Sequence, residues 1–158
     1  MTDWPPIEFA RWETPIENDE LHLVDLVYGD GSWSTEDRAG QRFEVPPVRP
    51  IFGGLIATFF SVEKRALFEI RSPDTFTFRM LDEHGLVDLW AASNARARPG
   101  RATFRVRHHG WHRESELSFV MSSAEYSFVI ATNWACLEIV VGQQPEIALV
   151  REVPALPA

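Results

Sequence analysis

Apolar and polar residues alternate along most of the chain, which is the pattern of half-buried β-strands. The first such run covers residues 21–28 and ends at the turn Gly29-Asp30-Gly31. A short strand is expected around 41–45, ahead of a proline-rich stretch. From residue 75 onward, further runs follow one another at 75–81, 86–92, 102–108, 111–121, 125–132 and 135–141. The pattern predicts an antiparallel meander of about eight strands.

One segment follows the helical period instead. Directly after two glycines, four apolar residues fall on a single helical stripe: Leu55, Phe59, Val62 and Ala66. The expected fold class is therefore mainly β, an antiparallel meander sheet or a small β-barrel with one short helix. Residues 1–158 are expected to form a single domain, with an irregular acidic arm at 1–20 and a Pro-rich surface tail at 142–158.

Two hairpins can be given a register from their turns. If His109 and Gly110 form a two-residue turn, Arg105 faces Glu114. If residues 82–85 form a four-residue loop, Arg79 faces Asp88. Opposite charges paired across strands contribute about 0.2–1 kcal/mol each, so these pairs support the predicted registers.

Composition places the chain among soluble proteins of a reducing compartment. Cys136 is the one cysteine, so an internal disulfide is excluded, and its apolar strand predicts an inert core thiol. The N-terminus lacks the basic start and apolar run of a signal peptide, and no apolar stretch reaches the roughly 18 residues of a membrane helix. We expect a cytoplasmic protein that contacts no membrane. No nucleophile or phosphate-loop motif occurs, and no cofactor is expected.

Charge is distributed unevenly along the chain. The net charge is −8, and residues 1–47 carry all of it, with eleven acids against three arginines. Residues 89–113 hold six arginines and no acid. The overall negative charge argues against a nucleic acid partner. The acidic and basic regions could also simply face each other in the fold.

The segment His108-His109-Gly110-Trp111-His112 is the densest group of potential metal ligands. In the predicted hairpin, however, alternation sends His108 and His112 to opposite faces and leaves His109 in the turn. The flanking arginines also oppose a cation. We therefore predict turn and rim residues here, and no metal site.

Four ionisable residues fall on or near apolar strand faces: Asp25, His108, Arg113 and Glu138. A carboxylate enclosed by apolar side chains has a raised pKa, which suits general acid–base catalysis. Structural ion pairs occupy such positions more often, and we favour that interpretation. At least one of Asp25 and Glu138 is expected to be mostly buried and paired with an arginine.

Tryptophans provide the other candidate residues. Trp111 lies in a predicted strand and could fill a core, whereas Trp4, Trp12 and Trp33 lie in irregular, acid-rich segments. Aromatic residues among acids are typical of a protein-binding surface. Alternatively, the arm folds back and buries these rings as a cap.

Two functions follow. The first is a non-catalytic protein-binding domain that masks a basic partner, as inhibitor or immunity proteins do, an analogy that rests on composition. The acids Glu17, Asp19 and Glu20 would then face solvent, so that neutralising them leaves stability unchanged. The second is a β-barrel that encloses a small apolar ligand, as a carrier or a cofactor-free isomerase, cyclase or lyase. In that barrel Asp25, His108, Arg113 and Glu138 would line the cavity.

Overall fold

The computed structural model describes residues 4–29, 33–46 and 54–156, and it is mainly β, with 45% strand and 16% helix. Every strand pair is antiparallel, as predicted. The strands are β1 (Glu8–Ala10), β2 (Leu21–Gly29), β3 (Trp33–Glu36), β4 (Arg42–Val45), β5 (Gly54–Ser61), β6 (Ala66–Ser72), β7 (Thr77–Asp82), β8 (Thr103–Arg107), β9 (Ser127–Ala131), β10 (Ala135–Val140) and β11 (Glu146–Glu152). The helices are a 3₁₀ turn (Glu83–Leu86), α1 (Val87–Ala95), α2 (Gly110–Glu114) and α3 (Glu116–Met121).

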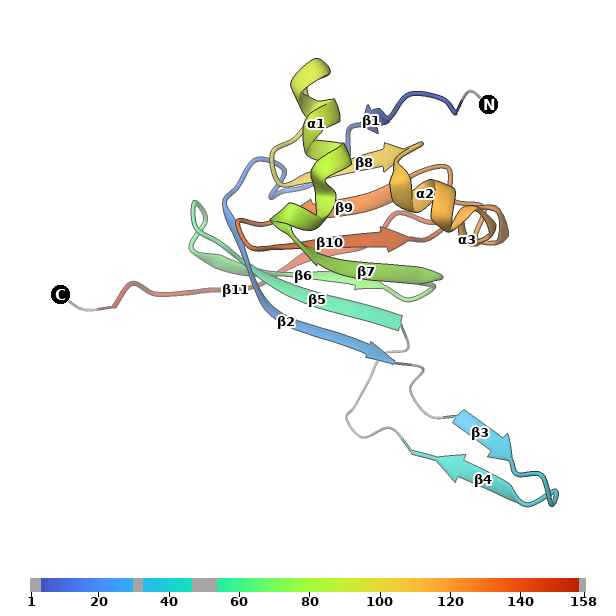
Figure 1. The fold of residues 1–158 in the computed structure, drawn as a ribbon. Helices are drawn as coiled ribbons and strands as arrows, with labels where there is room; N and C mark the ends of the chain where they lie inside the picture. Colours follow the sequence, from blue (N-terminus) through green and yellow to red (C-terminus); the bar gives the residue numbers. More distant parts are fainter. Residues whose placement is uncertain (1–3, 30–32, 47–53, 157–158) are drawn as a thin grey trace.

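These strands form three sheets. The five-stranded sheet has the order β1-β8-β9-β10-β7, the four-stranded sheet has the order β11-β6-β5-β2, and β3 pairs with β4 alone. Figure 1 shows the two larger sheets as stacked layers, with the helices beyond the five-stranded sheet and the β3–β4 hairpin standing away from both. The sheets are not closed into a barrel, so the barrel form of the prediction is wrong and the open-sheet form is confirmed.

The main core lies between the two larger sheets. Strand β5 alternates buried and half-buried positions along its whole length, which directs Leu55, Ala57 and Phe59 inward. Apolar residues of the opposite sheet meet them: Phe128, Ile130, Leu137 and Ile139. This packing fills the interior with side chains and leaves no barrel lumen for an apolar ligand.

The other face of the five-stranded sheet is covered by the helices. Leu86 and Leu89, three residues apart, pack on Phe104, Val106 and Val129. Further along the sheet, Trp111 of α2 and Phe119 of α3 pack on Val140. The molecule therefore has three layers, and the middle sheet is buried on both faces.

The predicted helix after the two glycines is wrong. Residues 54–72 form the hairpin β5–β6, in which Phe59 faces Phe68 across the strands. The stripe Leu55, Phe59, Val62 and Ala66 fits period 2 at its first two positions, while Val62 lies in the turn. Aromatic and β-branched residues such as Ile56, Thr58 and Phe60 favour a strand here.

Two predicted strands are helical instead. At 86–92, the Asp82 carboxylate accepts a hydrogen bond from the Gly85 amide at 2.9 Å and so caps a helical turn that leads into α1. At 111–121, α2 and α3 replace the predicted strand. Consequently Arg79 faces Glu138 rather than Asp88, and Arg105 faces Phe128 and Ala10 rather than Glu114.

The chain ends are part of the fold. The arm contributes β1 and buries Trp12 and Ile16 in the main core, so the capping interpretation holds for Trp12. Within the predicted tail, β11 forms an exposed edge strand of the four-stranded sheet. No helix among the described residues is long and apolar enough to cross a membrane.

Candidate functional site

Glu138 is the centre of a buried polar network on the helix-covered face of the five-stranded sheet. Its side chain is 1% exposed. The Arg79 guanidinium, from the neighbouring strand β7, reaches Oε2 with Nε and Nη2, each at 2.8 Å. The Ser127 hydroxyl, from β9, donates to Oε1. The prediction that Asp25 or Glu138 is buried and paired with an arginine is confirmed for Glu138.

His109 completes this network from the residue that precedes α2. Its Nε2 lies 2.7 Å from Glu138 Oε1, but the ring nitrogen is not aligned for a hydrogen bond, and Nδ1 has no partner among the described residues. The His109 side chain is 0% exposed. The contact is therefore close and enclosed, and solvent does not reach it.

The electrostatics keep Glu138 ionised. Burial raises its pKa, but the contacts with His109, Arg79 and Ser127 lower it more, so the pKa lies below its ordinary value. A general acid needs the opposite shift and access to a substrate. The network is therefore structural, because it ties β7, β9, β10 and the start of α2 together.

Histidines and aromatic rings form a second cluster beside this network. The His112 Nδ1 accepts a hydrogen bond from the His108 amide at 3.1 Å, and the His112 ring stacks on Phe119 with centroids 4.0 Å apart. The Trp4 indole donates to the His108 carbonyl at 2.9 Å. Burial, together with the neighbouring His109, His108 and Arg107, lowers the pKa of His112 to about 4. His112 is therefore neutral near pH 7 and acts as an acceptor.

Several predicted site residues converge around α2. The Arg79 guanidinium lies 4.7 Å from the centre of the buried Trp111 ring, and exposed Arg113 lies 5.8 Å from the Trp4 ring. Asp25 is instead exposed on the edge strand β2, far from this cluster in the topology. Trp33 lies in the projecting hairpin, and its side chain is outside the described part.

The cluster does not form a metal centre in the part of the chain that the structure describes, where no three His, Cys, Asp or Glu side chains could hold an ion. The prediction that strand alternation separates His108 from His112 is wrong, because α2 begins at Gly110 and no strand covers residues 110–114. The sequence reasoning also missed Ser127 and assigned Arg79 to another partner. The available signal was Glu138 itself, since a carboxylate in a buried strand requires a cation from an adjacent strand.

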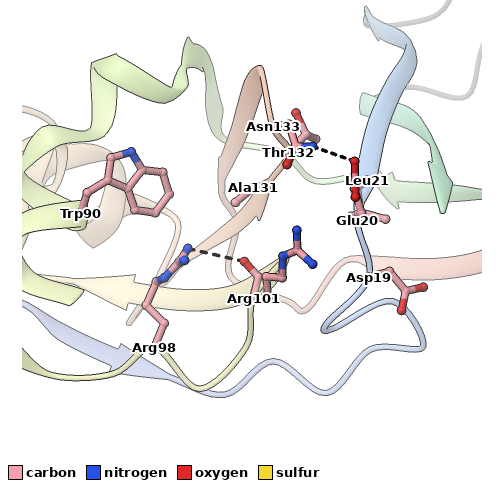
Figure 2. A pocket seen from close by; sticks show the side chains of 9 residues that line it. All are labelled: Asp19, Glu20, Leu21, Trp90, Arg98, Arg101, Ala131, Thr132 and Asn133. Carbon is pink, nitrogen blue, oxygen red and sulfur yellow. Dashed lines mark hydrogen bonds between the residues drawn. The ribbon is translucent and has the colours of Figure 1, made fainter. Parts of the chain in front are cut away.

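A surface pocket of about 300 Å³ lies elsewhere, where the start of β2, α1 with its following loop, and the β9–β10 turn meet. Figure 2 shows its lining, in which Arg98 lies beside Trp90, Arg101 lies farther toward Asp19, and the Asn133–Glu20 hydrogen bond closes the wall opposite Trp90. Of the pocket residues, only Asp19 and Glu20 were predicted from the sequence to take part in binding, as acids facing a basic partner.

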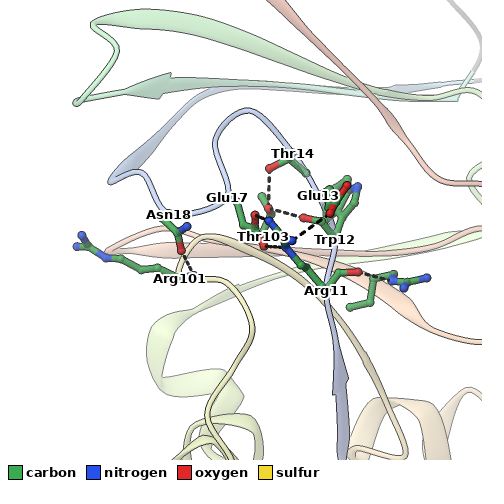
Figure 3. A network of polar contacts seen from close by, with 9 residues as sticks. Arg11, Trp12, Glu13, Thr14, Glu17, Asn18, Arg101 and Thr103 are labelled. Atoms are coloured by element: carbon green, nitrogen blue, oxygen red, sulfur yellow. Dashed lines mark hydrogen bonds and ion pairs between the residues drawn. The ribbon is translucent and has the colours of Figure 1, made fainter.

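Residues 17–20 join the two larger sheets, and we call this segment the strap. The backbone carbonyl of Glu17 accepts hydrogen bonds from Ala102 and Thr103 at the start of β8. The Glu17 carboxylate pairs with Arg11 at 2.8 Å. Figure 3 shows this pair together with the Asn18 side chain at the Arg101 backbone. The acidic arm therefore does face the basic segment of the chain.

The acids of the strap point inward rather than to solvent. Asp19 accepts hydrogen bonds from the Ser61 hydroxyl at 2.6 Å and from Lys64 at 2.7 Å, and Glu20 accepts one from Asn133 at 2.8 Å. Glu17 and Asp19 are each 8% exposed. Glu17, Asp19 and Glu20 were expected to form a solvated binding surface. This expectation is wrong for Glu17 and Asp19, which are buried, whereas Glu20 is half-buried.

Comparison with known proteins gives no match: no family model, curated protein or solved structure is similar to this chain.

Proposed function

We propose that the chain is a non-catalytic protein-binding domain that masks a basic partner, and that the β3–β4 hairpin is its binding element. The observation that carries this proposal is the exposure of the hairpin. Every described position from Ser34 to Glu44 is exposed, and the hairpin contributes no residue to the three apolar clusters. An isolated two-stranded hairpin is marginally stable in water, so it gains from packing against another molecule.

The hairpin has two unlike faces. Thr35 pairs with Phe43, and alternation places positions 33 and 45 on the same side. Phe43 is 43% exposed and supplies an aromatic anchor of the kind found in binding hot spots. The other side carries Ser34, Glu36, Arg42 and Glu44, and Glu36 pairs across the strands with Arg42. The net charge of −8 favours approach by a basic protein.

The buried ionisable residues do not support the alternative. Glu138 is enclosed and paired, Asp25 is exposed on an edge strand, and the space between the sheets is filled by side chains. Among the described residues, Asp25 and Glu138 therefore do not converge on a common cavity, as the enzyme or carrier hypothesis requires.

Affinity purification with cross-linking, from the source cells, tests the proposal. Two variants address the hairpin: Glu36→Gln with Glu44→Gln, and replacement of residues 30–53 by Asn-Gly. The second is feasible because Gly29 and Gly54 pair at the end of β2 and β5, where a two-residue turn can join them. The matched control is Glu116→Gln with Glu152→Gln, which removes two exposed charges elsewhere.

We expect a basic protein to co-purify with wild type and control, with cross-links to the hairpin. The Glu36/Glu44 variant should associate with it more slowly, by about tenfold at low salt, and the replacement should lose it. A partner retained by a folded replacement variant would exclude the hairpin as the binding element. A small molecule retained in native mass spectrometry, with no protein partner, would favour the ligand-binding alternative.

A further inference from the structure

Two arginines line the pocket beside α1, and no carboxylate of the described residues holds them in the way that glutamates hold several other arginines of the molecule. Arg11, Arg79 and Arg107 each form ion pairs with glutamates. Among the described residues, the guanidinium groups of Arg98 and Arg101 have no ion pair. Both lie in the loop between α1 and β8, which brings two positive charges to one pocket wall.

Arg98 is held in a partly enclosed position. Its guanidinium lies 4.7 Å from the centre of the Trp90 ring and 5.2 Å from that of Phe104. Its nearest polar partner is the Arg101 carbonyl, at the long distance of 3.5 Å. Burial lowers the pKa of Arg98, because the charged form loses solvation, and the neighbouring Cys136 offsets this only in part. A half-buried cation of this kind strongly favours an anionic ligand.

Arg101 completes the wall from an exposed position. Its backbone amide is fixed by the Asn18 side chain at 3.2 Å, so the base of the side chain is anchored while the guanidinium extends into the group of residues in Figure 2. Two guanidinium groups at one pocket provide the forked donors that match carboxylate and phosphate oxygens.

The acids that line the pocket do not neutralise these arginines. Asp19 directs both carboxylate oxygens to Lys64 and Ser61, and Glu20 is held by Asn133. The negative charge of Glu20 remains on the wall and disfavours a ligand with several negative groups. The pocket volume of about 300 Å³ is at the lower end for small-molecule sites.

We propose that this pocket binds a small molecule with a single carboxylate or phosphate group, which Arg98 and Arg101 hold against the Trp90 wall. The Asn133 amide and the Thr132 hydroxyl are the remaining polar groups placed to contact the rest of the ligand. This inference is independent of the hairpin and of the proposed protein partner.

NMR titration with ¹⁵N-labelled protein tests the proposal, with the Trp90 indole and the Arg98 Nε–H as reporters. A Trp90→Phe variant assigns the indole signal. Acetate and inorganic phosphate are the probes, added separately at constant ionic strength, with sodium chloride as the reference anion. The test variant is Arg101→Gln, whose exposed side chain is not needed for folding. Arg151→Gln is the control, since it removes an exposed arginine on β11.

We expect saturable shifts of both reporters with acetate, phosphate or both, and the stronger probe identifies the chemical group that the site prefers. Arg101→Gln should weaken binding about tenfold or more, and Arg151→Gln should leave it unchanged. Shifts that do not saturate, or that sodium chloride reproduces, would overturn the proposal. Equal affinity in Arg101→Gln and wild type would do so as well.

Discussion

At the scale of single residues, the Glu138 network makes the sharpest prediction about stability. Arg79→Met removes the cation from a carboxylate that is 1% exposed. We expect a loss of about 3–5 kcal/mol in the free energy of unfolding, because the buried charge loses its main compensation. Urea denaturation measures this loss. Arg113→Gln, at an exposed arginine of α2, should change stability by less than about 0.5 kcal/mol.

The double variant Arg79→Met with Glu138→Gln separates charge from packing. It removes both charges and keeps an amide that can accept from Ser127. We expect it to be more stable than Arg79→Met alone, since a neutral side chain costs less to bury. Equal losses in the single and double variants would mean that the packing of Arg79 on Trp111 matters more than its charge.

His112 makes a prediction about pH at the same scale. Its pKa is about 4 in the folded protein and close to the ordinary histidine value of 6.5 when unfolded. Between these values the unfolded chain binds the extra proton, so stability falls as the pH decreases from 6.5 to 4. His112→Asn keeps an acceptor for the His108 amide but does not titrate. The stability advantage of wild type over this variant should shrink by about 1–2 kcal/mol across that window, allowing for partial exposure. Glu138, whose pKa is lowered, is present in both proteins, so its titration cancels in the difference. A constant difference between wild type and variant would contradict the assignment to His112.

At the scale of elements, the sequence predicted strands better than helices. The strand pattern located β2, which has one face in the main core, and also β8, β9 and β10, which are rich in β-branched and aromatic residues and are buried on both faces. Strand β10 carries the predicted buried Glu138. Alternation failed at 111–121, where Leu117, Val120 and Met121 are exposed although they are apolar. Because these apolar residues are exposed to solvent, the segment lacks the 3.6-residue spacing of apolar positions by which an amphipathic helix is recognised. The α1 segment is apolar on several sides, so a strand fitted it equally well.

The same failures explain why the site was only partly predicted. His108 and Trp111 were identified as candidates, but the hairpin assigned to them separated His108 from His112, which stack 5.6 Å apart. His109 was placed at an exposed turn and is instead fully buried. These contacts depend on helix α2, which starts at Gly110. The Gly110 amide donates a hydrogen bond at 2.8 Å to the carboxylate of Asp88, a residue of α1. A single sequence does not reveal such a long-range partner.

At the scale of the whole molecule, the strap determines how the two larger sheets stay together. Asp19 bonds to Ser61 and Lys64 at the β5–β6 end of the four-stranded sheet. Glu20 bonds to Asn133 in the β9–β10 turn of the five-stranded sheet, and the Glu17 carbonyl accepts from the start of β8. Two of the acids of the N-terminal region, Asp19 and Glu20, therefore stabilise the stacking of the sheets.

Neutralising the strap with Glu17→Gln, Asp19→Asn and Glu20→Gln should consequently destabilise the protein. Hydrogen bonds to a charged, nearly buried carboxylate contribute about 1.5–3 kcal/mol, so we expect the Asp19 contacts alone to account for a loss of about 2–3 kcal/mol. The midpoint of thermal unfolding should fall by several degrees.

The matched control replaces Glu36, Glu44 and Glu152 with glutamine, which changes the net charge equally at exposed positions. If the control and the strap variant melt together, the strap acids do not hold the sheets, and a role for them in partner binding is open again. If only the strap variant melts early, the acids of the strap serve the fold.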